Sequence, residues 1–161
     1  MKVLVAYDGT LDSKTALRYV LEKIKESDGE LIVLYVFTRE LFIDYDALPG
    51  AEEAARKESS RYVREAEAII QEEGKGVKAS IIEAEGNQET EIIRYAHAEN
   101  IDLLLCPPRY KAVIKTFRKL LEERGIGTSV YAYSRNSDSA TPSAEITLYG
   151  AATFSALKFL W

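Results

Sequence analysis

The residues best suited to ligand chemistry follow the first apolar segment, where Asp8, Gly9 and Thr10 come directly after residues 3–7. Asp8 offers a carboxylate, and Gly9 gives the backbone the freedom that a tight turn needs. An unbroken apolar run is typical of a strand buried on both faces, and a helical pattern begins immediately afterwards. Ligands of open α/β sheets bind at the carboxyl ends of strands. The sequence therefore predicts a binding crevice that contains Asp8, Gly9 and Thr10.

A second group of candidate binding residues, Arg109, Tyr110 and Lys111, follows the apolar run 101–106. A helix is predicted to begin here without a Ser, Thr, Asp or Asn cap, so its first backbone N–H groups need other partners. Arg109 and Lys111 add positive charge at the positive end of the helix dipole, which an anion would offset. We expect either a phosphate-sized anion near Arg109 or water on the same groups. Val36, near the end of the second predicted strand, completes the predicted ligand-binding set.

Residues that carry out catalysis or hold metal ions are scarce in this chain. Its one histidine and one cysteine cannot assemble the usual zinc ligand sets. His97 lies within a helical pattern, without neighbours that would make it a base, and is predicted at the surface. Cys106 lies in an apolar run and is predicted to be a buried thiol of a cytoplasmic protein. We therefore predict no catalytic residue, no metal ion, no cofactor and no enzymatic activity.

The composition is that of one ordinary globular domain. The 161 residues suffice for a single core, with 47% hydrophobic and 29% charged residues. The net charge of −5 disfavours nucleic-acid binding. Because the first predicted strand begins at residue 2, no signal peptide is expected, and the predicted location is cytoplasmic.

Apolar runs alternate with amphipathic patterns along the chain, which predicts an α/β fold with a parallel sheet and helices on both faces. Ala79 and Ile81 alternate with polar residues, so their strand is expected at a half-exposed edge. The predicted architecture is an open, doubly wound sheet of five parallel strands in the order 3-2-1-4-5. The predicted strands cover residues 2–7, 31–37, 77–84, 101–106 and 128–134. The predicted helices cover residues 12–26, 51–73, 88–99 and a segment between Pro108 and Gly125. Asp12 is the predicted N-cap of the first helix.

The chain divides into an α/β domain at residues 1–134, a polar linker at 135–143 and an apolar tail at 144–161. Apolar residues recur in the tail at helical spacing, so a helix is predicted there. Sixteen helical residues reach about 24 Å, short of the ~30 Å hydrocarbon core, so the tail is not expected to span a membrane. It is expected to dock on protein. Residues 41–48 are predicted to form a surface connection or, alternatively, a lid or a contact for a protein partner.

Three parts of the sequence resemble the universal stress protein family: the first strand with its turn, the glycine after the third strand, and the third helix leading into the fourth strand. These are residues 3–10, Gly86, and residues 92–96 followed by 100–105. The order of elements agrees with the family from residue 1 to about residue 134. The resemblance implies a nucleotide-binding α/β fold, a role in the stress response, and a correspondence of Asp8 with the family's nucleotide-contacting aspartate.

The glycine signature of the ATP-binding members is missing from the matching position. In those members, two glycines spaced three apart follow the fourth strand, and a glycine with Ser or Thr comes about nine residues later to enclose phosphate. Pro107 and Tyr110 occupy the first two positions here, and no glycine occurs between Gly86 and Gly125. Proline has no N–H to donate to a phosphate. We therefore expect that ATP does not bind.

The resulting prediction is a homodimeric binding or regulatory domain, similar to a universal stress protein but without ATP binding. The dimer is expected to form through the fifth strand at the sheet edge and through the tail. One alternative is a protein that binds an adenine nucleotide or another phosphate ligand through Asp8 and the Arg109 region. Another is a module that docks on a protein or a membrane through its tail. The predicted dimer-interface residues are Val130, Tyr131, Tyr133, Phe154, Leu157 and Trp161.

Overall fold

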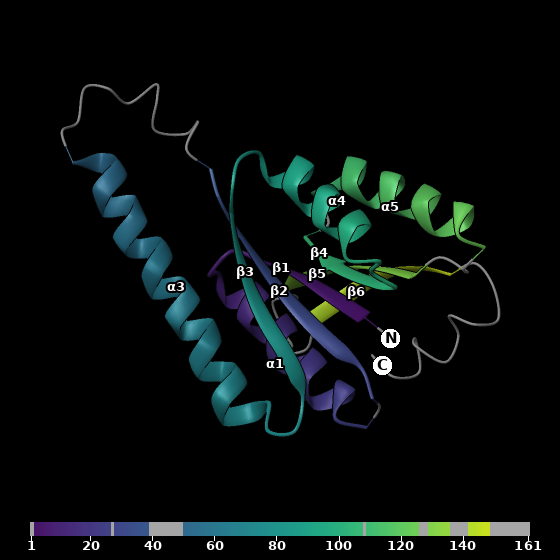
Figure 1. Ribbon diagram of the computed structural model, residues 1–161, viewed down its shortest axis with the longest axis horizontal. Helices are drawn as coiled ribbons and strands as arrows, with labels where there is room; N and C mark the ends of the chain where they lie inside the picture. The colour runs from purple at the N-terminus through teal and green to yellow at the C-terminus, as the bar shows by residue number, and fades with distance from the viewer. Residues whose placement is uncertain are drawn as a thin grey trace.

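The computed structural model describes residues 2–26, 28–38, 50–107, 109–125, 129–135 and 142–148, the last two segments as backbone. The strands form one sheet of six in the order β3-β2-β1-β4-β5-β6 (Figure 1). They are β1 Lys2–Tyr7, β2 Glu30–Phe37, β3 Lys78–Glu85, β4 Leu103–Cys106, β5 Ser129–Arg135 and β6 Pro142–Leu148. The helices are α1 Leu11–Ile24, α3 Ala51–Glu73, α4 Gln88–Ala98 and α5 Lys111–Glu123.

The central strands are parallel, as their apolar runs predict. β1 pairs with β2 on one side and with β4 on the other, and β2 pairs with β3. All four residues of β4 are buried, whereas β3 alternates between exposed and partly buried residues. This alternation fits its place at the edge of the sheet, which the sequence predicts. The α/β class and the strand order 3-2-1-4 are confirmed.

The far edge of the sheet differs from the prediction. β5 pairs in parallel with β4, and β6 then pairs antiparallel with β5, from Ser129 opposite Leu148 to Arg135 opposite Pro142. The sheet therefore has six strands rather than five, and the predicted helix is wrong for residues 144–148, which belong to β6. A helix there would leave the outer backbone groups of β5 without partners, whereas a returning strand pairs them. Residues 149–161 lie outside the described part of the chain.

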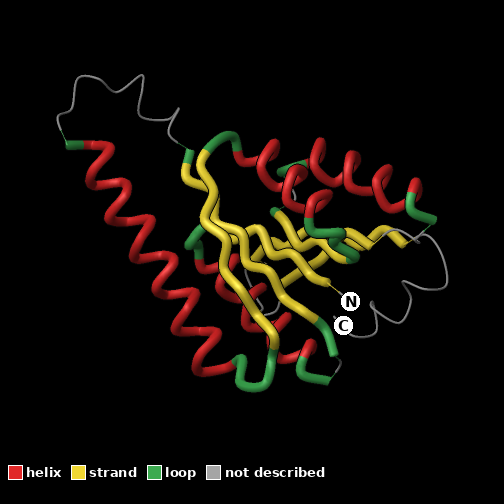
Figure 2. Tube along the Cα trace, in the orientation of Figure 1, coloured by secondary structure: helices red, strands yellow, loops and turns green. Residues whose placement is uncertain are grey.

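Two hydrophobic clusters form the core, one on each face of the sheet. Val5, Leu17 and Ala66 belong to the cluster beneath α1 and α3. Leu4 and Phe117 belong to the cluster beneath α4 and α5. Figure 2 shows the sheet between these two layers of helices. Consecutive residues of a strand point to opposite faces, which is why Leu4 and Val5 serve different clusters.

Two details at single residues test the sequence analysis. The N-cap of α1 is Thr10 and not Asp12, because the Thr10 side chain accepts a hydrogen bond from the Ser13 backbone N–H. Asp12 lies within the first turn, where a carboxylate is also favourable.

His97 is exposed and Cys106 is fully buried, as predicted. In the described part of the chain, no helix has the length and apolar character needed to cross a bilayer.

Candidate functional site

Asp8 lies at the carboxyl end of β1, in the turn that leads into α1. Its Oδ1 accepts hydrogen bonds from the Thr10 backbone N–H at 3.0 Å and from the Thr10 hydroxyl at 2.5 Å. The Thr10 oxygen in turn accepts from the Ser13 N–H at 3.2 Å. One side chain therefore both caps α1 and holds the Asp8 carboxylate against the turn.

Arg109, from the segment between β4 and α5, reaches the same carboxylate. Its Nη2 lies 3.4 Å from Asp8 Oδ2 and 3.2 Å from the Tyr110 hydroxyl. The guanidinium lies 4.8 Å from the centroid of the Tyr110 ring. The Asp8 side chain is 21% exposed and that of Arg109 is 63% exposed. The structure thus brings together Asp8 and Arg109, which the sequence places 101 positions apart, and sets an exposed cation beside a partly exposed carboxylate.

The start of α5 has the uncapped character that the sequence predicts. Tyr110 is the N-cap residue and makes no side-chain capping hydrogen bond. Its own N–H donates to the Pro107 carbonyl at 3.1 Å, within the turn after β4. Lys111 is the first residue of α5 and is exposed. This end of the helix can therefore accept a ligand or water at the backbone groups beyond Tyr110.

The side chain of Val36 does not lie with Asp8 and Arg109. It is 3% exposed and belongs to the hydrophobic cluster beneath α4 and α5. The Val36 carbonyl accepts a hydrogen bond from Gln88 Nε2 at 2.8 Å. The prediction that Val36 binds ligand is therefore not supported by its position. Side chains alternate along a strand, and this alternation points Val36 into the core.

Tyr62 of α3 lies beside the candidate site, although the sequence analysis does not identify it. Its ring packs directly on Gly9, in the turn beside Asp8, and leaves no room there for a larger residue. Lys14 and Arg61 have their charged groups 6.0 and 5.1 Å from the centroid of this ring. Lys14 also forms an ion pair with Glu65 of α3. α3 therefore packs against the turn formed by Asp8, Gly9 and Thr10. Gly9 and Tyr62 are 53 positions apart, so the local sequence pattern does not reveal their contact.

Three tyrosines link the binding turn to the region between β2 and α3. The Tyr7 hydroxyl donates to the Tyr62 carbonyl at 2.9 Å. Tyr35 has its ring centroid 6.4 Å from that of Tyr7 and 6.5 Å from that of Tyr62. Burial raises the pKa of the Tyr7 phenol, and nearby carboxylates such as Glu65 add to the effect. These phenols therefore remain protonated at neutral pH and act as hydrogen-bond donors and packing groups.

The predicted interface residues divide between two parts of the chain. Val130, Tyr131 and Tyr133 belong to β5, whose backbone pairs with β4 on one side and with β6 on the other. β5 is thus not the edge strand that the dimer prediction assumed. Phe154, Leu157, Trp161 and the segment 41–48 lie outside the described residues.

The side chains around Asp8 offer charged and polar groups to a ligand. Within the described ranges, no group of three or more His, Cys, Asp and Glu side chains could hold a metal ion. Asp8 and Arg109 can bind polar or charged groups of a ligand, at the carboxyl ends of β1 and β4 where ligands of such sheets bind.

The profile of the universal stress protein family matches residues 1–121. The chain belongs to the universal stress protein family. A search of curated protein sequences finds no match to it. Among solved structures, it is similar to a hypothetical protein with a TM-score of 0.52 and 26% identity, over 68% of this chain and 75% of that one.

Two further structures of family members have the same fold. A universal stress protein from Burkholderia pseudomallei is 20% identical, with a TM-score of 0.52 over 78% of this chain and 90% of that one. A family protein from Arabidopsis thaliana, whose structure holds AMP, is 20% identical, with a TM-score of 0.51 over 86% of this chain and 94% of that one. At this level of identity, both likenesses describe the fold.

Proposed function

We propose that this universal stress protein is a cytoplasmic, homodimeric binding domain of the stress response that neither binds ATP nor catalyses a reaction. The observation that carries the proposal is the set of contacts around Asp8. The carboxylate that corresponds to the family's nucleotide contact is held by Thr10 on one oxygen and approached by Arg109 on the other. A nucleotide that used Asp8 would have to displace the chain's own donors.

The turn after β4 supports the absence of ATP binding. At the two positions where the glycine signature would supply backbone donors, Pro107 has no N–H, and the Tyr110 N–H donates to the Pro107 carbonyl at 3.1 Å. A phosphate cradle depends on several N–H groups that converge on the anion. Neither of these two positions has a backbone donor left for a phosphate oxygen.

A phosphate-containing ligand is the second candidate, and the uncapped start of α5 favours it. Arg109 and Lys111 lie at this helix end, and both are exposed. The AMP in the Arabidopsis structure makes an adenine nucleotide a reasonable probe. In this alternative, Arg109 would leave Asp8 and contact the phosphate, while Asp8 would contact the rest of the ligand.

Calorimetric titration of the full chain with magnesium-ATP, with AMP and with inorganic phosphate tests both candidates. We expect no binding of ATP or AMP at micromolar concentration. If phosphate binds, Arg109→Ala should weaken it, because a charge-assisted hydrogen bond is removed. Lys115→Ala, on an exposed position of α5, serves as the control for a lost positive charge. Low-micromolar ATP or AMP affinity that Asp8→Ala abolishes would replace the proposed function with nucleotide binding.

The proposed dimer uses the sheet edge on the side of β6. Because β6 covers β5, the outer backbone groups of the sheet on that side belong to β6, and unpaired edges favour pairing with another strand. A second copy related by a two-fold axis would pair antiparallel there. The tail that follows β6 contains Phe154, Leu157 and Trp161 and is proposed to extend the same interface.

Sedimentation velocity is expected to show a dimer at micromolar concentration. Removing residues 149–161 keeps β6 and should weaken the dimer, because the apolar residues of the tail are lost. A full-length chain that sediments as a monomer at these concentrations contradicts the dimer. Binding of the full chain to liposomes, together with an unchanged dimer after truncation, would instead favour the membrane-docking alternative for the tail.

A further inference from the structure

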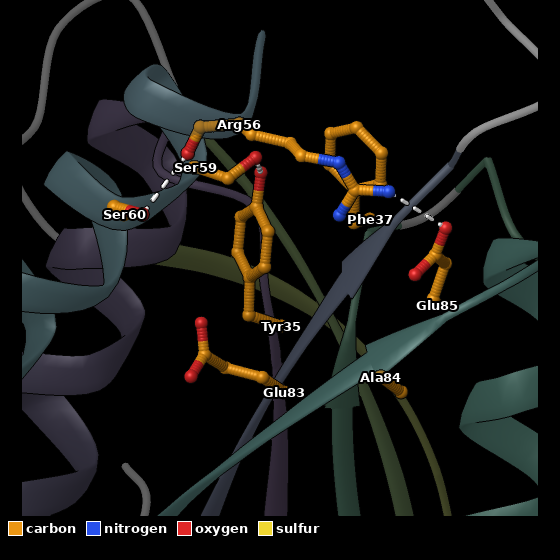
Figure 3. Close-up of a pocket in the computed structure, with 8 residues that line it drawn as sticks. All are labelled: Tyr35, Phe37, Arg56, Ser59, Ser60, Glu83, Ala84 and Glu85. Atoms are coloured by element: carbon orange, nitrogen blue, oxygen red, sulfur yellow. Dashed lines mark hydrogen bonds and ion pairs between the residues drawn. The ribbon is translucent and has the colours of Figure 1, made fainter. Parts of the chain in front are cut away.

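A second possible binding site lies away from the crevice at Asp8. It is a pocket of about 300 Å³ between α3 and the carboxyl halves of β2 and β3 (Figure 3). Aromatic side chains of β2, two serines and an arginine of α3, and carboxylates of β3 surround it. It shares no lining residue with the Asp8 crevice. Its volume is at the lower end of the range for small-molecule sites.

One wall of the pocket already holds a guanidinium group. Arg56 lies with its guanidinium carbon 4.5 Å from the centroid of the Phe37 ring. Its Nη2 pairs with Glu85 at 3.0 Å and with Glu52 at 3.1 Å. A cation between an aromatic face and two carboxylates is a recurring arrangement for binding organic cations. Phe37, Glu52 and Glu85 thus stabilise a positive charge at this wall of the pocket.

The opposite wall has the same types of group without a cation. Glu83 of β3 points to the side of the pocket lined by Tyr35, which in Figure 3 lies between Ser59 and Glu83. The Tyr35 hydroxyl and Ser59 Oγ are 2.8 Å apart and form a hydrogen bond. The Glu83 carboxylate has no hydrogen-bond or ion-pair partner within the part of the chain that the structure describes. A carboxylate beside an aromatic ring and a hydroxyl pair is therefore available to a ligand.

The charges around the pocket select the sign of the ligand. Among the lining residues, Arg56 contributes one positive charge, whereas Glu83 and Glu85 contribute two negative charges. On the same helix, Glu58 and Arg61 offset each other, with 3.5 Å between their charged groups. The excess of negative charge repels phosphates and carboxylates and attracts cations. Tyr35 supplies an apolar surface for a carbon chain.

We propose that this pocket binds a small organic cation, an alkylammonium or alkylguanidinium, whose charged group contacts Glu83 and whose carbon chain packs on Tyr35. The ammonium would donate to the Glu83 carboxylate, and the carbon chain would run along the Tyr35 ring towards the Tyr35–Ser59 hydroxyl pair. Arg56 keeps its partners, so the site does not require the wall to rearrange. The occupant is a free small molecule, since the pocket volume matches a few carbon atoms and one charged group. The proposal is independent of the function proposed for the Asp8 crevice.

Titration of the ¹⁵N-labelled full chain with butylammonium chloride at constant ionic strength tests the proposal by NMR. We expect saturable shifts of the backbone amides of Tyr35, Ser59 and Glu83. Glu83→Gln should weaken binding about five- to tenfold, because a charge-assisted contact becomes a neutral one. The control Glu72→Gln removes the same charge from an exposed position of α3, about 24 Å along the helix from Arg56 at 1.5 Å per residue. It should change the affinity less than twofold.

Three results would overturn the proposal. Equal weakening by Glu83→Gln and Glu72→Gln would mean diffuse attraction between charges. Shifts of the same amides with inorganic phosphate would mean that the pocket selects anions. Tighter binding of a lysine-containing tripeptide than of butylammonium would mean that the pocket docks a basic protein segment. Because Glu83 is exposed on an edge strand, the Glu83→Gln chain should fold, and an unchanged spectrum elsewhere verifies this.

Discussion

Gly9→Ala is expected to destabilise the protein by about 2–5 kcal/mol, because two costs coincide at this position. Gly9 has a φ of +79°, a conformation that costs a residue with a Cβ about 1–2 kcal/mol. A Cβ placed there would also lie 2.5 and 2.6 Å from Cδ1 and Cδ2 of Tyr62, and closer to Cγ. Such overpacking adds about 1–3 kcal/mol. Urea unfolding followed by circular dichroism measures the sum.

Gly76→Ala is the matched control for the contact with Tyr62. Gly76 has a φ of +83°, but nothing lies within 4 Å of the Cβ position. Its substitution should cost only the conformational part, about 1–2 kcal/mol. In a chain that already carries Tyr62→Ala, Gly9→Ala should cost no more than this. If Gly9→Ala and Gly76→Ala cost the same in the native background, Tyr62 does not confine the binding turn.

The Cys106 thiol is expected to react about a thousandfold more slowly in the folded protein than in the unfolded chain near pH 8. Burial raises the pKa of this thiol from 9.0 to about 12. The thiolate is the reactive form, and three pKa units lower its population about a thousandfold well below both values. Iodoacetamide labelling with and without urea, followed by mass spectrometry, measures the ratio. Comparable rates in both states would contradict a buried Cys106.

The same shift predicts how stability depends on alkaline pH. The folded-state pKa of Cys106 lies above the unfolded value, so its contribution to stability is complete below about pH 9. The contribution is lost as the pH rises from about 9 towards 12, because the unfolded chain releases its proton first. Cys106→Ala should remove this part of the alkaline loss of stability. If Cys106→Ala leaves the pH dependence of the unfolding free energy between pH 9 and 12 unchanged, the Cys106 thiol does not cause it.

Most of the fold could be predicted from the sequence, because burial on both faces leaves a direct pattern. The runs of β1, β2 and β4 are apolar without alternation, whereas β3, at the edge of the sheet, intersperses exposed residues with partly buried ones that pack on either cluster. These patterns determine the class, the order 3-2-1-4 and the place of Asp8 at a strand end. The missing glycines at Pro107 and Tyr110 are also evident in the sequence. They support the proposal that ATP does not bind.

Other features depend on contacts between distant residues, which local patterns do not encode. Arg109 reaches Asp8, and the ring of Tyr62 packs on Gly9, only because the sheet and α3 bring these segments together. Residues 142–148 have apolar spacing compatible with a helix, yet they form β6, since the edge of β5 offers a row of backbone partners. The charge of the second pocket is likewise a tertiary property, because α3 and β3 supply its groups from opposite sides. The sequence by itself thus determined the elements of the parallel sheet, their order and the strand ends that meet. Only the tertiary structure decided the sixth strand and which side chains pair across those ends, because both depend on how separate elements pack.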